Sequence, residues 1–456
     1  MSNTPKCLSI AVQVYVLAAQ NPPFSSTSNY THEDTILYTS RILVTMGMYP
    51  DLGWQSSLIQ TLNSQPPRHA TGILRRIMYE IMKPKELGLN CASLKLCITI
   101  LLNCAANAPK FNRAFVHCRS IYWICLTMRR LAHKTALFHQ DDFAFVVGCL
   151  KLCCTYLQTT FEQYGHTAVI QALEARLILT LVKSVDFVKA DWMIPNPNPP
   201  TRLGEQYQKL LDTIAGYAMY YSVATTLTKA LYRGEKYLGG TTRMTFKDEY
   251  LAFKKTVEER LMILGEWEMH GMNVCVNSRC TLRAHMPDKK AKGERIPFFR
   301  CSGCRIFYYC SNKCQKQAWA EHKETCRNFA ACRFAPDGTP NPPPHDARDE
   351  HFMGWAVQQH ILDARSKLLE YQSKYQSQRH IKSTEPLVSV MDFTIFPCRV
   401  ETITAAAAMK RSPKEDWKRW LLEASAKEGV DPLVMSILPS ADTPRYWVGF
   451  GVVVAP

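Results

Sequence analysis

The sequence predicts a mainly α protein that ends in a small α+β unit. The chain has 456 residues, of which 46% are hydrophobic, so it can bury a large core. From about residue 34 to 271 it carries long amphipathic stretches separated by Pro, Gly and Asn, without a run of alternating strand residues. Beyond residue 386 the periodicity becomes extended. Stacked helical pairs would fit the first pattern, although no fixed repeat period occurs.

Residues 1–271 are therefore predicted to form an α-helical domain. Ile73, Ile77 and Ile81 recur at i, i+4 and i+8, which places them on one helix face. A second helix is expected to begin at a Thr245 cap, followed three residues later by Asp248. Its apolar stripe, which predicts core packing, consists of Tyr250, Phe253, Val257, Leu261 and Leu264.

Proline-rich segments mark the expected loops. Residues 195–200 read Pro-Asn-Pro-Asn-Pro-Pro and predict a long loop inside the helical domain. Residues 334–350 contain a second proline run and predict a linker.

Residues 351–456 are predicted to form the α+β unit. A helix is expected over about 352–376, followed by a strand over 387–396 and a last strand over 446–454. Between the strands, Ser412-Pro413-Lys414-Glu415 predicts a capped helix start, with Trp417, Trp420, Leu421 and Ala424 along one face.

The 18 cysteines favour a reducing compartment, nucleus or cytoplasm. Disulfide scaffolds belong to short secreted chains without a core, and this chain is long. Eleven cysteines lie outside the metal-ligand pattern described below, mostly in apolar helical stretches, where free cysteine acts as a small buried hydrophobe. Examples are Cys97, Cys104, Cys149, Cys153 and Cys154. The chain has no run of about 18 uncharged apolar residues, so no membrane span is expected.

The formal charge of +16 is concentrated between residues 275 and 333. That segment has 13 basic and 4 acidic residues, whereas residues 1–274 carry a net +8 and residues 334–456 a net −1. Basic residues help to keep cysteines deprotonated, so part of this charge suits a thiolate metal site. The remainder leaves nucleic-acid binding open as an alternative.

Eight residues in the same segment have the chemistry and spacing of zinc ligands. Zinc prefers four sulfur or imidazole donors in a tetrahedron, and closely spaced pairs supply them. Eight donors complete two tetrahedra and leave no open position, which is typical of structural sites. The residues are Cys275, Cys280, Cys301, Cys304, Cys310, Cys314, His322 and Cys326. His285 is a weaker candidate, since a loop histidine in solvent explains it as well.

The segment Cys301-Ser-Gly-Cys304-Arg-Ile-Phe-Tyr-Tyr-Cys310-Ser-Asn-Lys-Cys314-Gln-Lys-Gln-Ala-Trp-Ala-Glu-His322-Lys-Glu-Thr-Cys326 resembles the MYND zinc finger. We therefore expect a MYND-type finger over residues 272–333. The resemblance implies interleaved binding of two Zn²⁺ ions, with Cys275, Cys280, Cys310 and Cys314 on one and Cys301, Cys304, His322 and Cys326 on the other. Two features depart from the family: four residues separate the first cysteine pair, and a basic insertion lengthens the connection from Cys280 to Cys301.

The resemblance also implies a partner class. Fingers of this family bind short proline-rich peptides, with the positions matching Gln315 and Trp319 taking part. An indole face packs well on proline, and an amide can fix the peptide backbone. The alternative is that Trp319 only fills the core of the finger. Pro340 to Pro344 could also occupy this groove of the same chain at high effective concentration, although an inert linker is the simpler interpretation. The leading hypothesis is a non-enzymatic adaptor that binds proline-rich protein segments, and no catalytic residue is nominated.

Other functions find less support in the sequence. A SET-type lysine methyltransferase would need a second SET segment after the finger, and its motifs are missing. Nucleic acid could bind to the basic residues around Arg300, with Phe298 and Phe299 stacking on bases. The other basic residues of that surface are Lys289, Lys290, Lys292 and Arg295. A metal site at His345, Asp346, Asp349, Glu350 and His351 competes with a simpler interpretation, in which the acidic residues are a solvated helix start.

Overall fold

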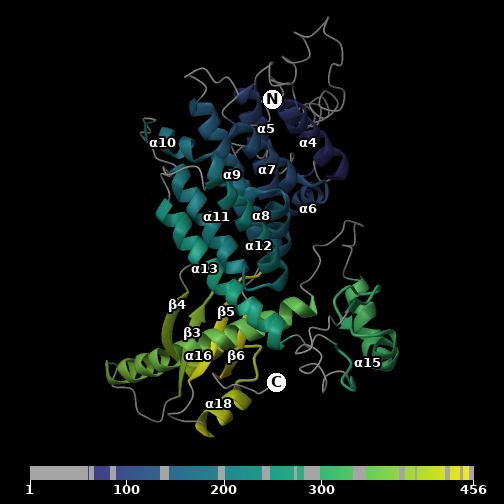
Figure 1. Cartoon of the computed structure of the whole chain (residues 1–456), viewed down its shortest axis with the longest axis vertical. Coiled ribbons are helices and arrows are strands. Elements are labelled where there is room, and N and C mark those ends of the chain that lie inside the picture. Colours follow the sequence, from purple (N-terminus) through teal and green to yellow (C-terminus); the bar gives the residue numbers. More distant parts are fainter. Residues whose placement is uncertain are drawn as a thin grey trace, which may run out of the picture.

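The fold is mainly α-helical, as the sequence predicts (Figure 1). In this computed structural model the structure describes residues 60, 66–82, 89–133, 143–193, 201–238, 247–271, 275–281, 298–331, 346–378, 386–395, 398–426, 432–441 and 445–450. The expected loop at 195–200, the Thr245 cap, His285, His345 and the prolines at 340–344 lie outside these residues.

The described helices between residues 66 and 271 form one helical body. They gather around α8, which contacts α5, α7, α9, α10, α11 and α12. The elements are α4 (Pro66–Met82), α5 (Cys91–Asn107), α6 (Pro109–His117), α7 (Ser120–Leu131), α8 (Phe143–Glu174), α9 (Leu177–Lys183), α10 (Val185–Met193), α11 (Leu203–Tyr217), α12 (Tyr221–Leu238), α13 (Lys247–Glu266) and the π-helical turn η4 (Trp267–Gly271).

By length and composition alone, α8 could cross a membrane, and half of its most apolar window is buried inside the protein. The surrounding helices supply an apolar environment for it, as expected for a central core helix. The helix bends at Gly165, where φ is +59°. A β-carbon there would lie 3.2 Å from the backbone nitrogen of Ala441, so the bend also allows a close approach of the C-terminal unit.

The apolar stripes predicted from the sequence face the core. Ile73, Ile77 and Ile81 are buried on α4. On α13 Leu261 is partly buried, and the other four stripe residues are buried: Tyr250, Phe253, Val257 and Leu264. The periodicity therefore identified the buried faces correctly.

The C-terminal unit packs directly on the helical body through a long helix. This helix, α16 (Ala347–Gln378), contacts α12, α13 and η4 on one side and strands β3 and β4 on the other. The sheet has the order β4-β3-β5-β6, in which β3 and β5 are parallel and the outer pairs are antiparallel. Its strands are β3 (Leu387–Asp392), β4 (Arg399–Thr404), β5 (Leu433–Leu438) and β6 (Arg445–Phe450).

The two faces of the sheet are covered by different elements. Met391 and Val434 join the core of the helical body, and Gln372 of α16 donates to the Ser389 hydroxyl over 3.1 Å. The other face packs on α17 (Ala405–Arg411) and α18 (Trp417–Ala426) around Trp417. Because successive side chains of a strand point to opposite faces, one short sheet can contribute residues both to the core of the helical body and to the core around Trp417.

The prediction that a helix opens at Ser412 is wrong. Ser412 closes the preceding helix α17, since its N–H bonds the Ala408 carbonyl, and its own carbonyl accepts from Trp417 Nε1 over 2.7 Å. The helix α18 begins at Trp417, and Asp416 accepts from the Arg419 N–H over 3.3 Å as its cap. The last part of the predicted linker is also helical, because α16 begins at Ala347.

Candidate metal centre

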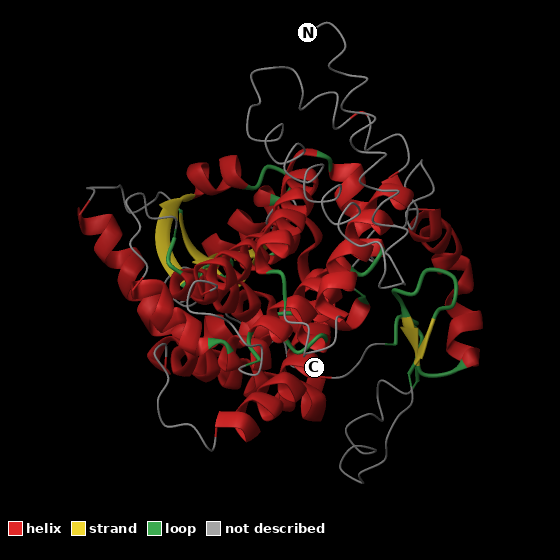
Figure 2. Ribbon diagram, turned by 90° about the horizontal axis from the view of Figure 1, so that it is seen from above, coloured by secondary structure: helices red, strands yellow, loops and turns green. Residues whose placement is uncertain are grey.

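The ligand residues lie in a small finger at the side of the helical body (Figures 1 and 2). Its described parts are residues 275–281, the hairpin of β1 (Phe299–Arg300) and β2 (Tyr308–Tyr309), and helix α15 (Asn312–Ala331). Residue 275 forms a parallel bridge with Tyr308, and Val276 donates to the Tyr308 carbonyl over 3.0 Å. The segment before the hairpin is thereby joined to it.

The structure brings the eight predicted ligands together in the two interleaved groups that the family resemblance implies. Within each group the candidate ligand atoms all lie within 4.8 Å of one another. One group is Cys275, Cys280, Cys310 and Cys314, and the other is Cys301, Cys304, His322 and Cys326. Seven of the eight residues are buried and Cys310 is partly exposed.

The distances fit metal coordination and rule out disulfides. Cys310 Sγ lies 3.5 Å from Cys280 Sγ and 3.4 Å from Cys314 Sγ. A tetrahedral zinc with bonds of about 2.3 Å to sulfur separates its sulfurs by about 3.8 Å, whereas a disulfide requires about 2.05 Å. These cysteines therefore have the spacing of ligands that share one ion.

The second group has the same geometry with a mixed donor set. His322 Nε2 lies 3.4 Å from Cys301 Sγ and 3.6 Å from Cys304 Sγ, and the two sulfurs of Cys301 and Cys326 are 3.8 Å apart. The two groups thus fit two zinc ions, one bound by four cysteines and one by three cysteines and a histidine.

A tight turn positions the pair Cys301 and Cys304. The Cys301 N–H bonds the Phe307 carbonyl over 2.8 Å, and Arg305 closes the turn by donating to the Cys301 carbonyl over 2.9 Å with a left-handed φ of 59°. Gly303 lies against the site: a β-carbon there would come within 2.6 Å of Cys326 Sγ. Glycine is required here by space, a role that the ligand spacing alone did not reveal.

Helix α15 presents three ligands on one side. Cys314, His322 and Cys326 lie at positions that differ by eight and four residues, so they recur on the same face. Ser311 caps the helix, because its hydroxyl accepts from the Cys314 N–H over 3.2 Å. The sequence from Gln315 to Thr325 has no helix breaker, which explains why one uninterrupted helix can serve both sites.

Hydrogen bonding prepares some of the thiols for ionisation. Burial by itself would raise the pKa of Cys314, but hydrogen bonds with Asn277, Cys310 and Ser311 outweigh it and lower the pKa to about 7. Burial would also raise the pKa of Cys301, and the backbone N–H groups of Cys304 and Gly303 lower it. Since zinc binds thiolates, these donors favour the binding form.

The histidine ligand is surrounded by aromatic rings. Phe307 meets His322 edge to face, with centroids 4.8 Å apart, and Trp319 lies 5.7 Å from it at 66°. Burial lowers the pKa of His322, which favours the neutral imidazole that a metal requires. The rings therefore hold the ligand in place and keep it deprotonated.

The two predicted peptide-binding residues lie one helical turn apart on α15. Trp319 remains 42% exposed although one side of its ring is close to His322. Gln315 is partly buried, and no described residue hydrogen-bonds its side chain. Filling the core is therefore not the only role open to Trp319.

A polar cluster that the sequence did not predict attaches the finger to the start of α16 in the C-terminal unit. Tyr308 donates to Asp346 Oδ2 over 2.6 Å, Arg300 forms an ion pair with the same carboxylate, and the Ala347 N–H bonds the Ile306 carbonyl over 3.0 Å. Arg348 lies over the Tyr308 ring at 4.4 Å. These contacts join the hairpin to the first turn of α16.

The expectation that Asp346 and Asp349 form a solvated helix start is therefore wrong. They are 8% and 2% exposed, respectively. Asp346 Oδ1 accepts from the Arg348 and Asp349 N–H groups, and Asp349 Oδ1 accepts from the Ser222 N–H over 2.8 Å. They do cap the helix, but the same carboxyls also join it to the finger and to α12. The spacing Asp346-x-x-Asp349 is a helix-capping pattern that can be recognised in the sequence.

Two of the described residues of the basic surface are engaged within the protein. The ion pair with Asp346 compensates the charge of Arg300, and Phe298 is partly buried against the cores of the body and the finger. Phe299 is exposed. The basic residues at 289, 290, 292 and 295 lie outside the described residues.

The five cysteines outside the finger for which a core position is predicted are buried, and so is Cys125. Burial raises the pKa of Cys104 and of Cys125 to about 12, so both thiols stay protonated at neutral pH. The same holds for the thiols of Cys149, Cys153 and Cys154, whose pKa is also raised by burial. These residues act as small apolar side chains, as the sequence predicts.

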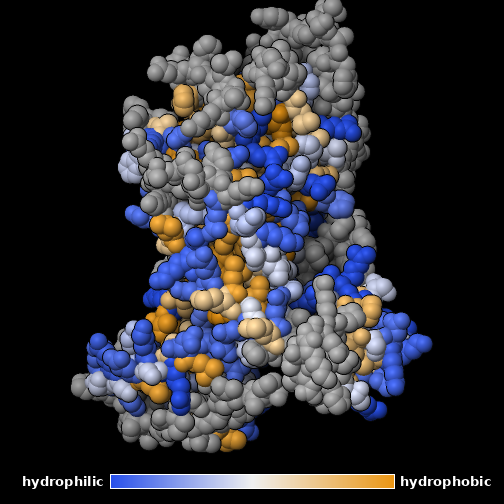
Figure 3. All heavy atoms as spheres, in the orientation of Figure 1, coloured by the Kyte–Doolittle hydropathy of each residue, from blue (hydrophilic) through white to orange (hydrophobic). Residues whose placement is uncertain are grey.

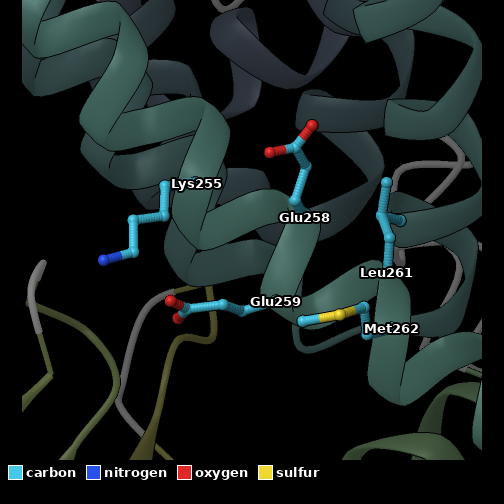
Figure 4. A pocket seen from close by; sticks show the side chains of 5 residues that line it. All are labelled: Lys255, Glu258, Glu259, Leu261 and Met262. Carbon is cyan, nitrogen blue, oxygen red and sulfur yellow. The ribbon is translucent and has the colours of Figure 1, made fainter.

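Apart from the finger, an open pocket lies on α13, lined by Lys255, Glu258, Glu259, Leu261 and Met262 (Figure 4). Apolar surface is exposed over the part of the molecule where α12 and α13 lie (Figure 3). Leu251 and Met262 are among the exposed apolar side chains of α13.

Comparison with known proteins identifies the finger. A family model of the MYND finger matches residues 289–326. Histone-lysine N-methyltransferase SMYD3 of Homo sapiens and its counterpart of Mus musculus are each 52% identical over 40 residues, which is 8% of this chain and 9% of theirs. The chain thus spans less than a tenth of the length of these relatives. No solved structure matches the chain. The family match begins after Cys275 and Cys280, so these two ligands are assigned by geometry.

Proposed function

We propose that this protein is a non-enzymatic adaptor whose MYND finger recognises short proline-rich segments of other proteins through Gln315 and Trp319. The observation that carries the proposal is the position of Trp319. Its ring contacts the His322 ring on one side, while 42% of the side chain remains exposed on α15. A fixed, exposed indole is suited to packing on proline rings.

Gln315 adds a polar group beside this ring. Residues four apart lie next to each other on a helix surface, and no described residue hydrogen-bonds the Gln315 carboxamide. By contrast, Gln317 accepts from Asn277 over 3.0 Å and so serves the finger itself. The Gln315 amide is therefore available to the backbone of an extended peptide.

A catalytic role is not proposed. Both relatives are named as methyltransferases, but the likeness covers only the finger. Each zinc group has four protein donors and leaves no coordination position for a substrate, so we assign the ions a structural role. The buried free thiols fit a reducing compartment, and we propose the nucleus or the cytoplasm.

Fluorescence anisotropy with a synthetic proline-rich peptide tests the proposal on the full chain. Trp319→Ala should weaken binding by about 10- to 100-fold, as truncation of an aromatic anchor does, and Gln315→Ala by less. Glu321→Ala, an exposed change on another side of α15, should bind like the wild type. Zinc content is measured in each variant. Equal affinities for wild type and Trp319→Ala, with both zincs retained, would end the proposal.

A further inference from the structure

A buried arginine without an acidic partner lies where α13, α16 and the β3–β4 turn meet. Arg260 of α13 is 7% exposed, and its guanidinium carbon lies 5.3 Å from the ring centroid of Phe393. Its Nε and Nη1 atoms are buried and make no hydrogen bond. Among the described residues no carboxylate forms an ion pair with it. Buried cations are normally paired, so this arrangement needs an explanation.

The contact with Phe393 compensates only part of the cost of burial. A ring face attracts a cation, but it does not supply hydrogen-bond acceptors to a five-donor group. Burial lowers the pKa of Arg260 to about 10, so the side chain is still charged at neutral pH. The folded protein therefore contains a buried positive charge that an anion would stabilise.

A second buried nitrogen without a hydrogen bond lies beside it. His360 of α16 has its ring centroid 5.5 Å from that of Phe393, so both side chains contact the same ring. Its Nε2 atom is buried without a hydrogen bond. Burial, helped by the charge of Arg260, lowers the pKa of His360 to about 3. The imidazole is thus neutral and can donate through Nε2 in the corresponding tautomer.

The acidic groups nearby do not fill this role. The Asp392 carboxylate accepts from the N–H and the hydroxyl of Thr394 at the start of the turn. Glu259 is exposed and lines the open pocket on α13 (Figure 4). Burial raises the pKa of Cys398 to about 11, so this thiol is neutral as well.

We propose that Arg260 and His360 form a binding site for the oxyanion of a small molecule, a phosphate or a carboxylate group. The site lies between the helical body and the C-terminal sheet, and ligand sites often lie at such junctions. Guanidinium and imidazole donors are well matched to oxyanion oxygens. The site is separate from the zinc finger and does not depend on the function proposed for it.

Thermal unfolding of the full chain tests the site with inorganic phosphate and with acetate as probes, against chloride at equal ionic strength. Either probe should raise the Tm in a saturable way, and the effective one identifies the source of the oxyanion. Arg260→Met should weaken the response about 100-fold or more and leave the anion-free protein at least as stable, because an unpaired buried charge is removed. Lys255→Met, which removes an exposed cation from the same helix, should respond like the wild type.

A second readout does not depend on the folding of the arginine variant. The effective anion should shift the NMR resonance of the His360 ring in the wild type, which is assigned by its absence in His360→Gln. Saturable stabilisation together with this shift supports the site. The proposal is overturned if neither anion exceeds chloride, if Arg260→Met responds like the wild type, or if the His360 resonance does not move.

Discussion

The Tyr308 hydroxyl donates to Asp346 Oδ2 over 2.6 Å and thereby connects the hairpin of the finger to the helix that carries the C-terminal sheet. Both groups are largely buried, and Arg300 and Arg348 surround them with positive charge. The finger is therefore held in a defined place against α16 rather than attached only through the chain.

Removal of this hydroxyl should loosen the finger. In Tyr308→Phe the ring contact with Arg348 persists, but the Asp346 carboxylate loses a donor, which should cost about 1–3 kcal/mol locally. We expect faster hydrogen exchange of finger amides and faster zinc transfer to a chelator. Tyr371→Phe, at an exposed tyrosine of α16, is the matched control. Unchanged exchange in Tyr308→Phe would show that the contact does not hold the finger.

Zinc should be bound with a stoichiometry of two per chain. The two sites share the hairpin and α15, so loss of one ligand set should destabilise the other. Cys304→Ser should reduce zinc to one ion or fewer in native mass spectrometry. Chelation should unfold the finger, because so small a segment relies on its metals, while the far-UV signal of the helical body remains. A wild-type protein without bound zinc would contradict this account.

Gly303→Ala should damage the site that contains His322. The added β-carbon would lie 2.6 Å from Cys326 Sγ, and a metal-bound sulfur cannot move aside. We expect at least a 10-fold loss of affinity for one zinc, measured by competition with a chelator. Gly265→Ala is the control, since a β-carbon there meets nothing within 4 Å. Full affinity in Gly303→Ala would mean that the turn can relax.

Acid should destabilise the protein partly through His360. Its folded pKa is about 3, below the value of about 6.5 expected for the unfolded chain, so the unfolded state binds the proton more readily. This contribution to stability is complete above pH 6.5 and is lost as the pH falls from 6.5 towards 3. Between pH 6.5 and 4.5 the wild type should lose about 2 kcal/mol more than His360→Gln.

Urea unfolding at the two pH values measures this difference, and comparison with the variant cancels the acid sensitivity of the zinc sites. His117→Gln, at an exposed histidine of α6, should keep the wild-type pH dependence. If the wild type and His360→Gln lose equal stability, His360 is not buried in its neutral form.

The helices were predictable because their signals are local. The stripe from Tyr250 to Leu264 repeats with the helical period, and this alone identifies the buried face. The strands β4 and β5 were missed, since short edge and parallel strands carry little periodicity of their own. The predicted helix start at Ser412 is wrong because Ser412 closes α17 instead. The same residue could cap the end of one helix or the start of the next, and only the folded chain decides between these two roles.

The ligands of the metal centre could also be predicted from the sequence. Residue type and spacing identified all eight ligands, since zinc selects cysteine and histidine in close pairs. The need for glycine at position 303 and the role of Asp346 could not be read from spacing. Gly303 lies against Cys326, which is 23 residues further along the chain, and Asp346 bonds Tyr308, which is 38 residues earlier.

The amino-acid sequence by itself determined the helical character of the chain and the identity of its zinc ligands, because periodicity and ligand chemistry act over a few residues. The tertiary structure decided how closely the ligands of each group approach one another, that the finger packs against α16, and that Arg260 is buried beside His360. These properties arise from burial and from charge at short range, and distant segments acquire both only when they pack together.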